Sequence, residues 1–183
     1  MTEISTDIES ALKFLYMDEL IAIPTETVYR LAANAFSEDA VKKIFELKQR
    51  PIFNPLIVHI GSIDDLDKIA KNIPDVAWKL AEAFWPGPLT LLLEKKDIIP
   101  DIVTAGSERV AVRIPNHKLT LDLLSKLTFP VAAPSANPFM SISPTKTIHV
   151  MDSFEGKLKF ILEGGDCEKG IESTIIGFED KDA

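Results

Sequence analysis

The stretch IAIPTETVYRLAAN, residues 21–34, decides how the rest of the chain is interpreted. A short apolar run ends at Pro24, and two threonines flank Glu26 directly after it. The run has the length and composition of a buried strand, and the residues from Arg30 onward have a helix-like pattern. The stretch therefore predicts a strand, a polar loop and then a helix. Hydroxyl and carboxylate groups at such a strand end either line a ligand site or cap the following helix.

Apolar runs of strand length alternate with amphipathic segments along the whole chain. Residues 37–50 are the clearest helix, because Ser37 is a good cap and acidic residues precede basic ones. This alternation, without a repeat or a low-complexity linker, predicts a single α/β domain built around a twisted sheet. The strands at 89–94 and 110–114 are open to antiparallel pairing. Other helices are expected at 5–17, after Ser62, at 74–85, at 118–127 and after Pro144, and other strands at 20–24, 56–60, 130–133, 159–163 and 173–178.

Composition limits the class of protein. The 183 residues are 46% hydrophobic and 26% charged, as in water-soluble globular domains, and the longest apolar runs are too short to cross a membrane. The acidic, polar N-terminus does not resemble a secretory signal, and a lone cysteine, Cys167, excludes an internal disulfide. A cytoplasmic protein is expected. The net charge of −8 argues against a general nucleic-acid binder, so RNA binding would need a local basic patch.

Several familiar catalytic motifs are absent. The sequence has neither a P-loop nor a dinucleotide-binding glycine motif, and its three histidines lack zinc-ligand spacing. Cys167 has no neighbouring base in the sequence, which argues against a thiol nucleophile. We therefore expect no metal-binding residues and no covalent intermediate on a side chain.

Polar residues gather instead at the ends of the expected strands. PTET (24–27), PSAN (134–137) and SPT (143–145) each follow an apolar run or a turn, and Glu172, Ser173 and Thr174 begin the last strand. In open α/β sheets, ligands bind at strand ends. Each cluster alone has a purely structural explanation in turns and caps, but together they indicate a binding site.

Three cations have open interpretations. Lys48 and Arg50 either form an anion site at the end of a helix or only complement the helix dipole. Arg113 interrupts an apolar strand, where an unpaired guanidinium would be costly to bury. It therefore faces solvent, a buried acid or a substrate carboxylate.

Eight motifs in order along nearly the whole chain resemble those of the YrdC-like threonylcarbamoyl-AMP synthases. The resemblance implies an α/β fold with a twisted, largely mixed sheet and flanking helices around an open, positively charged basin. It also implies that L-threonine, bicarbonate and ATP react to threonylcarbamoyl-AMP and pyrophosphate with Mg²⁺ present. Partner proteins then modify tRNA. The motifs are PTETVY (24–29), the K-x-R of Lys48 and Arg50, NPLIVHI (54–60), WPGPLTLLL (85–93), VAVRIPNH (110–117), APSAN (133–137), SPT (143–145) and GIESTI (170–175).

The same resemblance implies roles for individual residues. No side chain acts as a nucleophile. Lys48 and Arg50 position the reactants and stabilise developing charge. Threonine would be held by Thr27, His59, Arg113 and Ser173, and the nucleotide by Lys48, Arg50, Asn54, Ser135, Asn137 and Ser143.

The chain departs from the family pattern at three places. Arg30 stands where the family usually has glycine, which points to positive φ or a close backbone approach, and Met140 replaces a glycine before SPT, which makes the nucleotide loop less adaptable. Arg30 would then be strained, contact a phosphate or point outward. The family also continues beyond ESTI to an arginine that contacts the nucleotide. We therefore expect residues 1–183 to be a single YrdC-like domain truncated at its C-terminus.

Two rival functions remain. The first is a non-catalytic YrdC-like module that binds tRNA or double-stranded RNA through a patch of Lys48, Arg50, Arg109 and Arg113. The second is a carbamoyl-transfer module like that of hydrogenase-maturation proteins. These proteins are longer and carry cysteine-rich metal motifs, which one cysteine cannot supply.

Overall fold

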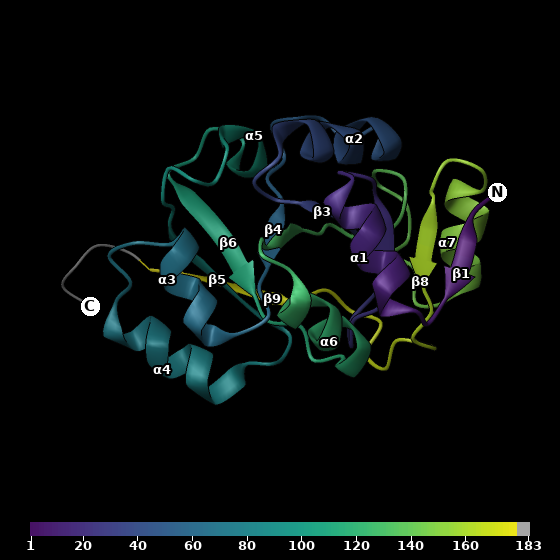
Figure 1. The fold of residues 1–183 in the computed structure, drawn as a ribbon. Helices are drawn as coiled ribbons and strands as arrows, with labels where there is room; N and C mark the ends of the chain where they lie inside the picture. The colour runs from purple at the N-terminus through teal and green to yellow at the C-terminus, as the bar shows by residue number, and fades with distance from the viewer. Residues whose placement is uncertain (179–183) are drawn as a thin grey trace.

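The computed structural model describes residues 1–178, and the charged tail EDKDA at 179–183 lies outside the described part. Within it, helices and strands alternate as expected, and helices lie on both sides of a twisted sheet (Figure 1). The helices are α1 (Ile8–Tyr16), α2 (Glu38–Lys48), α3 (Leu66–Ile69), α4 (Asp75–Phe84), α5 (Asp101–Thr104), α6 (Lys118–Lys126) and α7 (Thr147–Phe154), with a 3₁₀ turn η1 at Ile63–Asp65. The strands are β1 (Glu3–Ser5), β2 (Ile21–Ile23), β3 (Arg30–Asn34), β4 (Ile57–His59), β5 (Leu89–Glu94), β6 (Arg109–Arg113), β7 (Val131–Ala132), β8 (Phe160–Leu162) and β9 (Thr174–Gly177).

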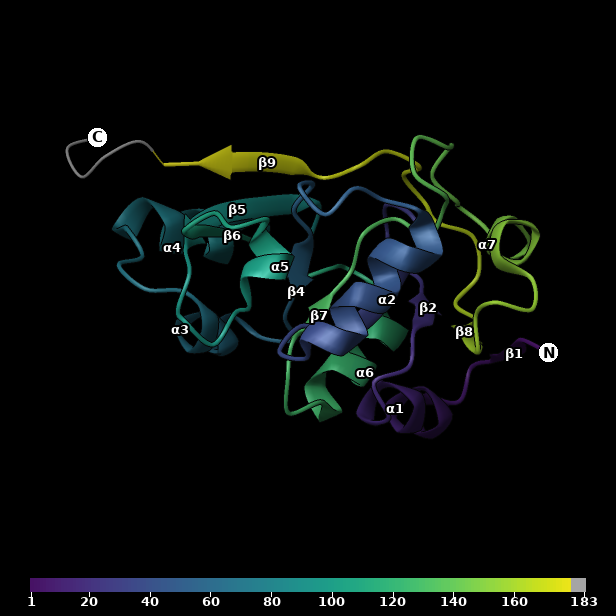
Figure 2. The ribbon, with the colours of Figure 1, turned by 90° about the horizontal axis from the view of Figure 1, so that it is seen from above.

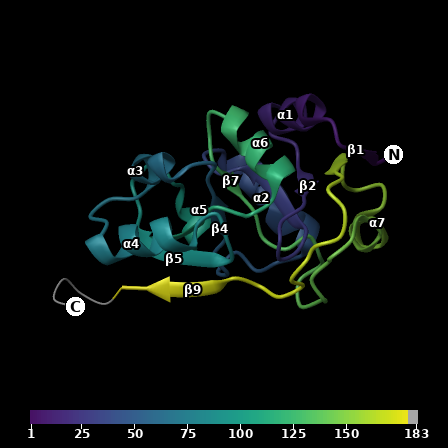
Figure 3. The same cartoon turned by 90° about the horizontal axis from the view of Figure 1, so that it is seen from below.

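In residues 1–178 the strands form one mixed sheet of nine, in the order β1-β8-β2-β3-β7-β4-β6-β5-β9. β4 and β6 are parallel, whereas β7 runs antiparallel to both β3 and β4. β5 and β6 pair antiparallel, which resolves the topology that the sequence left open. β9 lies parallel to β5 at one edge (Figure 2), far from β1 and β8 at the other end of the sheet (Figure 3). The expected mixed α/β sheet is confirmed.

The hydrophobic core is divided between two groups of buried residues. α1 and α6 pack on one of them, with Leu15 and Leu124 among the apolar side chains that they contribute. The larger group contains the buried residues of α2 and α5, including Ile44 and Val103. The sheet therefore has apolar cover on both sides, and polar side chains that lie on it need partners of their own.

The helix signals of the sequence work well at α2. Ser37 accepts from the Ala40 backbone N–H at 3.2 Å, and Gln49 ends the helix with a left-handed φ of 52°. The helix expected at 37–50 is confirmed, and it ends at Lys48, slightly before the expected limit. At α1 the cap is Asp7, whose carboxylate accepts from the backbone N–H groups of Glu9 and Ser10.

One expectation is wrong, and one strand was missed. The helix expected from Arg30 onward is strand β3, which pairs with β2 and β7 on its two sides. The local pattern LAAN suits either conformation, and the two neighbouring strands supply the hydrogen bonds that decide it. The strand β1 was not predicted. It is only three residues long and pairs with β8, which lies more than 150 residues later in the chain.

Candidate functional site

The PTET loop between β2 and β3 is a rigid, fully buried turn. Thr25 Oγ1 donates to the Val28 carbonyl at 2.7 Å and accepts from the backbone N–H groups of Thr27 and Val28, both at 3.2 Å. Thr120 of α6 donates to the Pro24 carbonyl at 2.5 Å. Hydroxyl groups that bond to nearby backbone fix a turn. The threonine-rich sequence therefore builds this loop as well as supplying side chains to the site.

Arg113 at the end of β6 is held by this loop. Its Nη2 donates to Glu26 Oε1 at 2.6 Å, its Nη1 and Nη2 both lie 3.2 Å from Thr27 Oγ1, and its Nε donates to the Gly87 carbonyl at 3.0 Å. The other oxygen of Glu26 accepts from the Asn116 backbone N–H at 3.1 Å. Of the three alternatives for Arg113, the structure therefore shows the buried acid.

His59 lies beside Arg113, because β4 and β6 pair with these two residues opposite each other. Its side chain is completely buried, and among the described residues neither ring nitrogen has a hydrogen-bond partner. Burial, with the positive charges of Arg30 and Arg113, holds the pKa of His59 well below its usual value. The ring is therefore neutral near pH 7, with one nitrogen able to donate and the other to accept. Buried polar atoms of this kind normally have partners, so they point to a ligand contact.

Ser173, the fourth residue expected at threonine, lies just before β9. Its hydroxyl is 2.7 Å from the hydroxyl of Thr90, which is buried in β5. The preceding residues pass beside the PTET loop, because the backbone N–H of Gly170 donates to the Thr27 carbonyl at 3.0 Å. The structure thus brings Thr27, His59 and Arg113 together and places the segment that carries Ser173 next to them.

Lys48 points into the loop that contains Ser135 and Asn137. Its ammonium donates to the carbonyls of both residues, at 2.5 Å for Ser135, and lies 3.3 Å from Asn137 Oδ1. Three oxygen acceptors favour the charged form, but burial and the nearby charge of Arg50 lower the pKa of Lys48 to about 7. This lysine therefore supports the 135–137 loop in the present arrangement, and its charge is sensitive to pH near neutrality.

The remaining residues expected at the nucleotide are less buried. Arg50 donates to the carbonyls of Asn54 at 3.2 Å and Pro55 at 3.0 Å, and its guanidinium lies over the Phe139 ring, 5.7 Å from the centroid. Ser143 Oγ donates to Glu172 at 3.0 Å. Lys48 and Arg50 thus bond to two different loops.

Two acidic partners of buried arginines were not assigned roles from the sequence. Arg30 donates to Glu172 at 2.6 Å, as Arg113 donates to Glu26. A signal was present, since both acids lie inside motifs that the sequence singled out, and a buried guanidinium needs an anion. Arg30 is not among the residues with positive φ, whereas Met140 is, at 65°. Of the interpretations of Arg30, strain and an outward orientation are wrong.

Other chemistry is limited within residues 1–178. Burial raises the pKa of Cys167 to about 11, so its thiol is protonated near pH 7. The described residues contain no group of three or more His, Cys, Asp or Glu side chains placed to hold a metal ion.

None of the helices in this part is long and apolar enough to span a bilayer. Because Lys48 and Arg113 are buried, they cannot contribute to the exposed basic patch considered for RNA.

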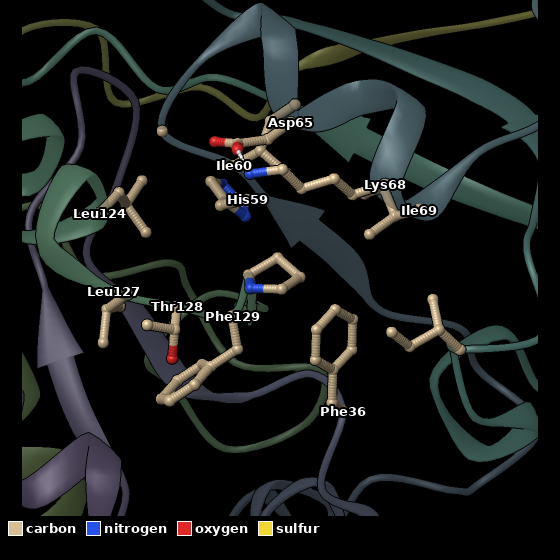
Figure 4. A pocket seen from close by; sticks show the side chains of 13 residues that line it. Phe36, His59, Ile60, Asp65, Lys68, Ile69, Leu124, Leu127, Thr128 and Phe129 are labelled. Atoms are coloured by element: carbon tan, nitrogen blue, oxygen red, sulfur yellow. Dashed lines mark hydrogen bonds and ion pairs between the residues drawn. The ribbon is translucent and has the colours of Figure 1, made fainter.

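A separate cavity of about 320 Å³ adjoins the site and shares only His59 with the residues discussed above (Figure 4). An ion pair between Lys68 and Asp65, at 2.6 Å, lies on one side of it, and most of its walls are apolar. The cavity contains none of the expected threonine or nucleotide ligands apart from His59. It is lined by Phe36, His59, Ile60, Gly61, Asp65, Lys68, Ile69, Ile98, Leu124, Leu127, Thr128, Phe129 and Pro130.

The chain is similar to known proteins over nearly its whole length. It is 50% identical over 169 residues to the threonylcarbamoyl-AMP synthase of Pyrococcus abyssi, which covers 92% of this chain and 50% of that protein. It is 47% identical to the threonylcarbamoyl-AMP synthase of Bacillus subtilis, over 97% of this chain and 53% of the relative. The chain therefore spans about half the length of these curated relatives.

Comparison of the fold with solved structures identifies the same group of proteins. The crystal structure of P. abyssi Sua5 complexed with L-threonine superposes with a TM-score of 0.93 at 46% identity, covering 97% of this chain and 54% of that one. The Sua5_yciO_yrdC family, which carries the description "Telomere recombination", matches residues 13–183. The expected YrdC-like family is therefore confirmed: this chain belongs to the Sua5/YciO/YrdC family.

Proposed function

We propose that this chain is a threonylcarbamoyl-AMP synthase domain, which joins L-threonine, bicarbonate and ATP and releases pyrophosphate. The observation that carries the proposal is the buried set of Thr27, His59 and Arg113, in a chain that superposes on a relative crystallised with L-threonine. A guanidinium, a hydroxyl and a neutral imidazole match the carboxylate, amine and side-chain hydroxyl of threonine.

The proposed reaction needs positioning more than a reactive side chain. The amine nitrogen of threonine bonds to the carbon of bicarbonate. This step forms a carbamate and releases water. A carbamate oxygen then attacks the α-phosphorus of ATP, so that an O–P bond forms as the bond to pyrophosphate breaks. Holding the two anions in line and neutralising charge supplies most of the catalysis in such transfers. The protonated thiol of Cys167 is consistent with a reaction that uses no side-chain nucleophile.

In this proposal Arg113 binds the threonine carboxylate, and Thr27, His59 and Ser173 bind its other polar groups. Lys48 and Arg50 face the phosphates and neutralise their charge. The 135–137 loop that Lys48 supports, together with Asn54 and Ser143, surrounds the rest of the nucleotide.

Magnesium enters the proposal as part of the substrate Mg–ATP. Mg²⁺ is commonly held by substrate phosphates and water with only one or two carboxylates. The acids nearest the site, Glu26 and Glu172, are each paired with an arginine, which fits a metal carried by the nucleotide rather than by a protein cluster. A cytoplasmic location and transfer of the product to tRNA by partner proteins belong to the same proposal.

Calorimetric titration tests the proposal most directly. L-threonine is titrated into the chain with and without a non-hydrolysable ATP analogue and Mg²⁺, and L-serine serves as the control ligand. We expect binding of threonine that is strengthened by nucleotide, and threonine-dependent release of pyrophosphate from ATP. Salt-sensitive RNA binding without binding of threonine or nucleotide would replace the synthase with the RNA-binding module.

The variant Arg113→Lys sharpens this test. Lysine keeps a cation near Glu26 but loses the two-pronged guanidinium that grips a carboxylate. We expect threonine affinity to fall by about tenfold or more, while nucleotide affinity changes little. Equal losses for both ligands would show that Arg113 does not bind threonine selectively.

A further inference from the structure

Arg30 lies inside the candidate site. Its side chain is only 1% exposed, with Nη1 donating to the Ala133 carbonyl at 3.2 Å and Nη2 donating to Glu172 at 2.6 Å. Arg30 pairs with Ser135 across the sheet, but its guanidinium contacts the carbonyl of Ala133. Ala133 lies two residues closer to Val131 than Ser135 does, and Val131 is the strand partner of His59. The Arg30 side chain therefore extends along β7 in the direction of the threonine ligands.

Access to these ligands is closed in this arrangement. Thr27, His59 and Arg113 have no solvent-exposed surface, so a molecule that contacts all three must displace a side chain next to them. Arg30 Nε and both ring nitrogens of His59 are buried and have no partner among residues 1–178. After burial, the charge of Arg30 is the next cause of the lowered pKa of His59. Arg30 is thus a long side chain near His59 with an unpartnered donor, and its movement would make room for a polar ligand.

Glu172 is the more exposed partner of the ion pair with Arg30. Its carboxylate is about half exposed, and it accepts from both Arg30 and, at 3.0 Å, Ser143 Oγ. A phosphate oxygen accepts from the same two donors and competes for them. Glu172 also lies close in sequence to Gly170, whose N–H bonds to the Thr27 carbonyl at 3.0 Å. The Arg30–Glu172 pair therefore connects the segment before β9 to β3, and the Gly170 bond connects the same segment to Thr27.

We propose that Arg30 controls admission of the amino acid: paired with Glu172 it closes the threonine site, and a nucleotide phosphate that replaces Glu172 at Arg30 and Ser143 opens it. This inference rests on the proposed function, because it concerns the same site and the same two ligands. Nucleotide then binds first and increases the affinity for threonine. By linkage, threonine strengthens nucleotide binding by the same factor.

The test compares threonine affinity with and without a saturating non-hydrolysable ATP analogue and Mg²⁺ in four proteins. In the unaltered chain, nucleotide should raise threonine affinity on the order of tenfold, within the usual range of coupling between sites. Arg30→Gly should bind threonine without nucleotide as tightly as the unaltered chain does with it. Glu172→Gln keeps the shape of the side chain but not its charge. Without nucleotide, its affinity for threonine should lie between those of the unaltered chain and Arg30→Gly.

Glu9→Gln is the matched control. It removes the carboxylate of another 2.6 Å ion pair, with Lys126, which is exposed and lies outside the site. This variant should show the full nucleotide effect. Circular dichroism establishes that each variant is folded. If Arg30→Gly does not fold, Arg30→Lys replaces it, and the nucleotide effect should shrink because lysine lacks the second prong.

Two other results have separate meanings. If the folded variants at Arg30 and Glu172 bind both ligands with an undiminished nucleotide effect, the closure is overturned and the synthase assignment stands. If none of the folded proteins binds threonine or nucleotide, the proposed function is overturned and the closure with it.

Discussion

The Arg113 guanidinium and the Glu26 carboxylate form a 2.6 Å ion pair in which both side chains are buried. Their attraction must offset the loss of hydration of two charges, so such a pair adds little net stability, but removal of one partner is costly. Glu26 also fixes the Asn116 N–H, so the pair connects the PTET loop to the chain leading into α6. The same contact thus organises the site and places Arg113 where a substrate carboxylate would compete for it.

The first prediction concerns this pair. Arg113→Ala should lower the free energy of unfolding by about 3–5 kcal/mol, because Glu26 is left buried without a counter-charge. The double variant Glu26→Gln with Arg113→Met should lose clearly less, since neither remaining group is charged. Urea denaturation of both variants checks this. Equal losses would mean that the buried charge does not determine the cost.

The second prediction concerns Lys48. Its pKa is about 7 in the folded chain, below the ordinary value of 10.5, so between these values the unfolded chain binds more protons. The free energy of unfolding should therefore rise with pH above 7, by at most about 1.4 kcal/mol per pH unit. Below pH 7 the Lys48 ammonium is charged, and the full cost of burying that charge lowers the free energy of unfolding. Above pH 7 the ammonium loses its proton, and this cost disappears.

Urea denaturation from pH 7 to 8.5 measures this rise, because below pH 7 the lowered pKa of His59 also makes the unfolded chain bind more protons. Cys167 sets the upper limit of this pH range. Because its pKa is raised in the folded chain, the folded thiol keeps its proton to a higher pH than the unfolded thiol, and the free energy of unfolding falls there as pH rises. Lys48→Met should remove the rise. Parallel pH profiles for the two proteins would show that Lys48 stays charged in the fold.

The third prediction uses Met140, which has a φ of 65° and is 91% exposed. A side chain in the left-handed region costs about 1 kcal/mol or more, and glycine avoids that cost. Met140→Gly should raise the free energy of unfolding by up to about 1 kcal/mol, after the entropy that glycine adds to the unfolded chain. Ile142→Gly is the control. It is 94% exposed but is not among the positive-φ residues, so it should not stabilise.

The fourth prediction tests how tightly the PTET loop is packed. A Cβ added at Gly164 would lie 2.5 Å from Pro24 Cγ and 2.6 Å from His117 Cε1. Gly164→Ala should therefore destabilise the chain by about 1–3 kcal/mol, since packed side chains must shift. At Gly177 an added Cβ meets nothing closer than 3.6 Å, so Gly177→Ala should have a smaller effect in thermal unfolding. Similar shifts in Tm would contradict this account of the loop.

The sequence by itself determined the class of fold, most helix limits and the family. α2 is an example: the Ser37 cap and the order of acids and bases act within one or two turns, so the sequence predicts where the helix begins and ends. The polar motifs at strand and helix ends indicated a binding site, and the resemblance to the family assigned Thr27, His59 and Arg113 to threonine and Lys48 to the nucleotide.

Only the tertiary structure decided the conformation of β3 and the partners of the buried charges. Residues Arg30–Asn34 become a strand because β2, just before them in the chain, and β7, which comes much later, supply the hydrogen bonds on both sides. Arg30 finds Glu172 and Arg113 finds Glu26 across 142 and 87 residues. A charge can be buried only where its partner is brought close, and the packing of the whole sheet decides that distance.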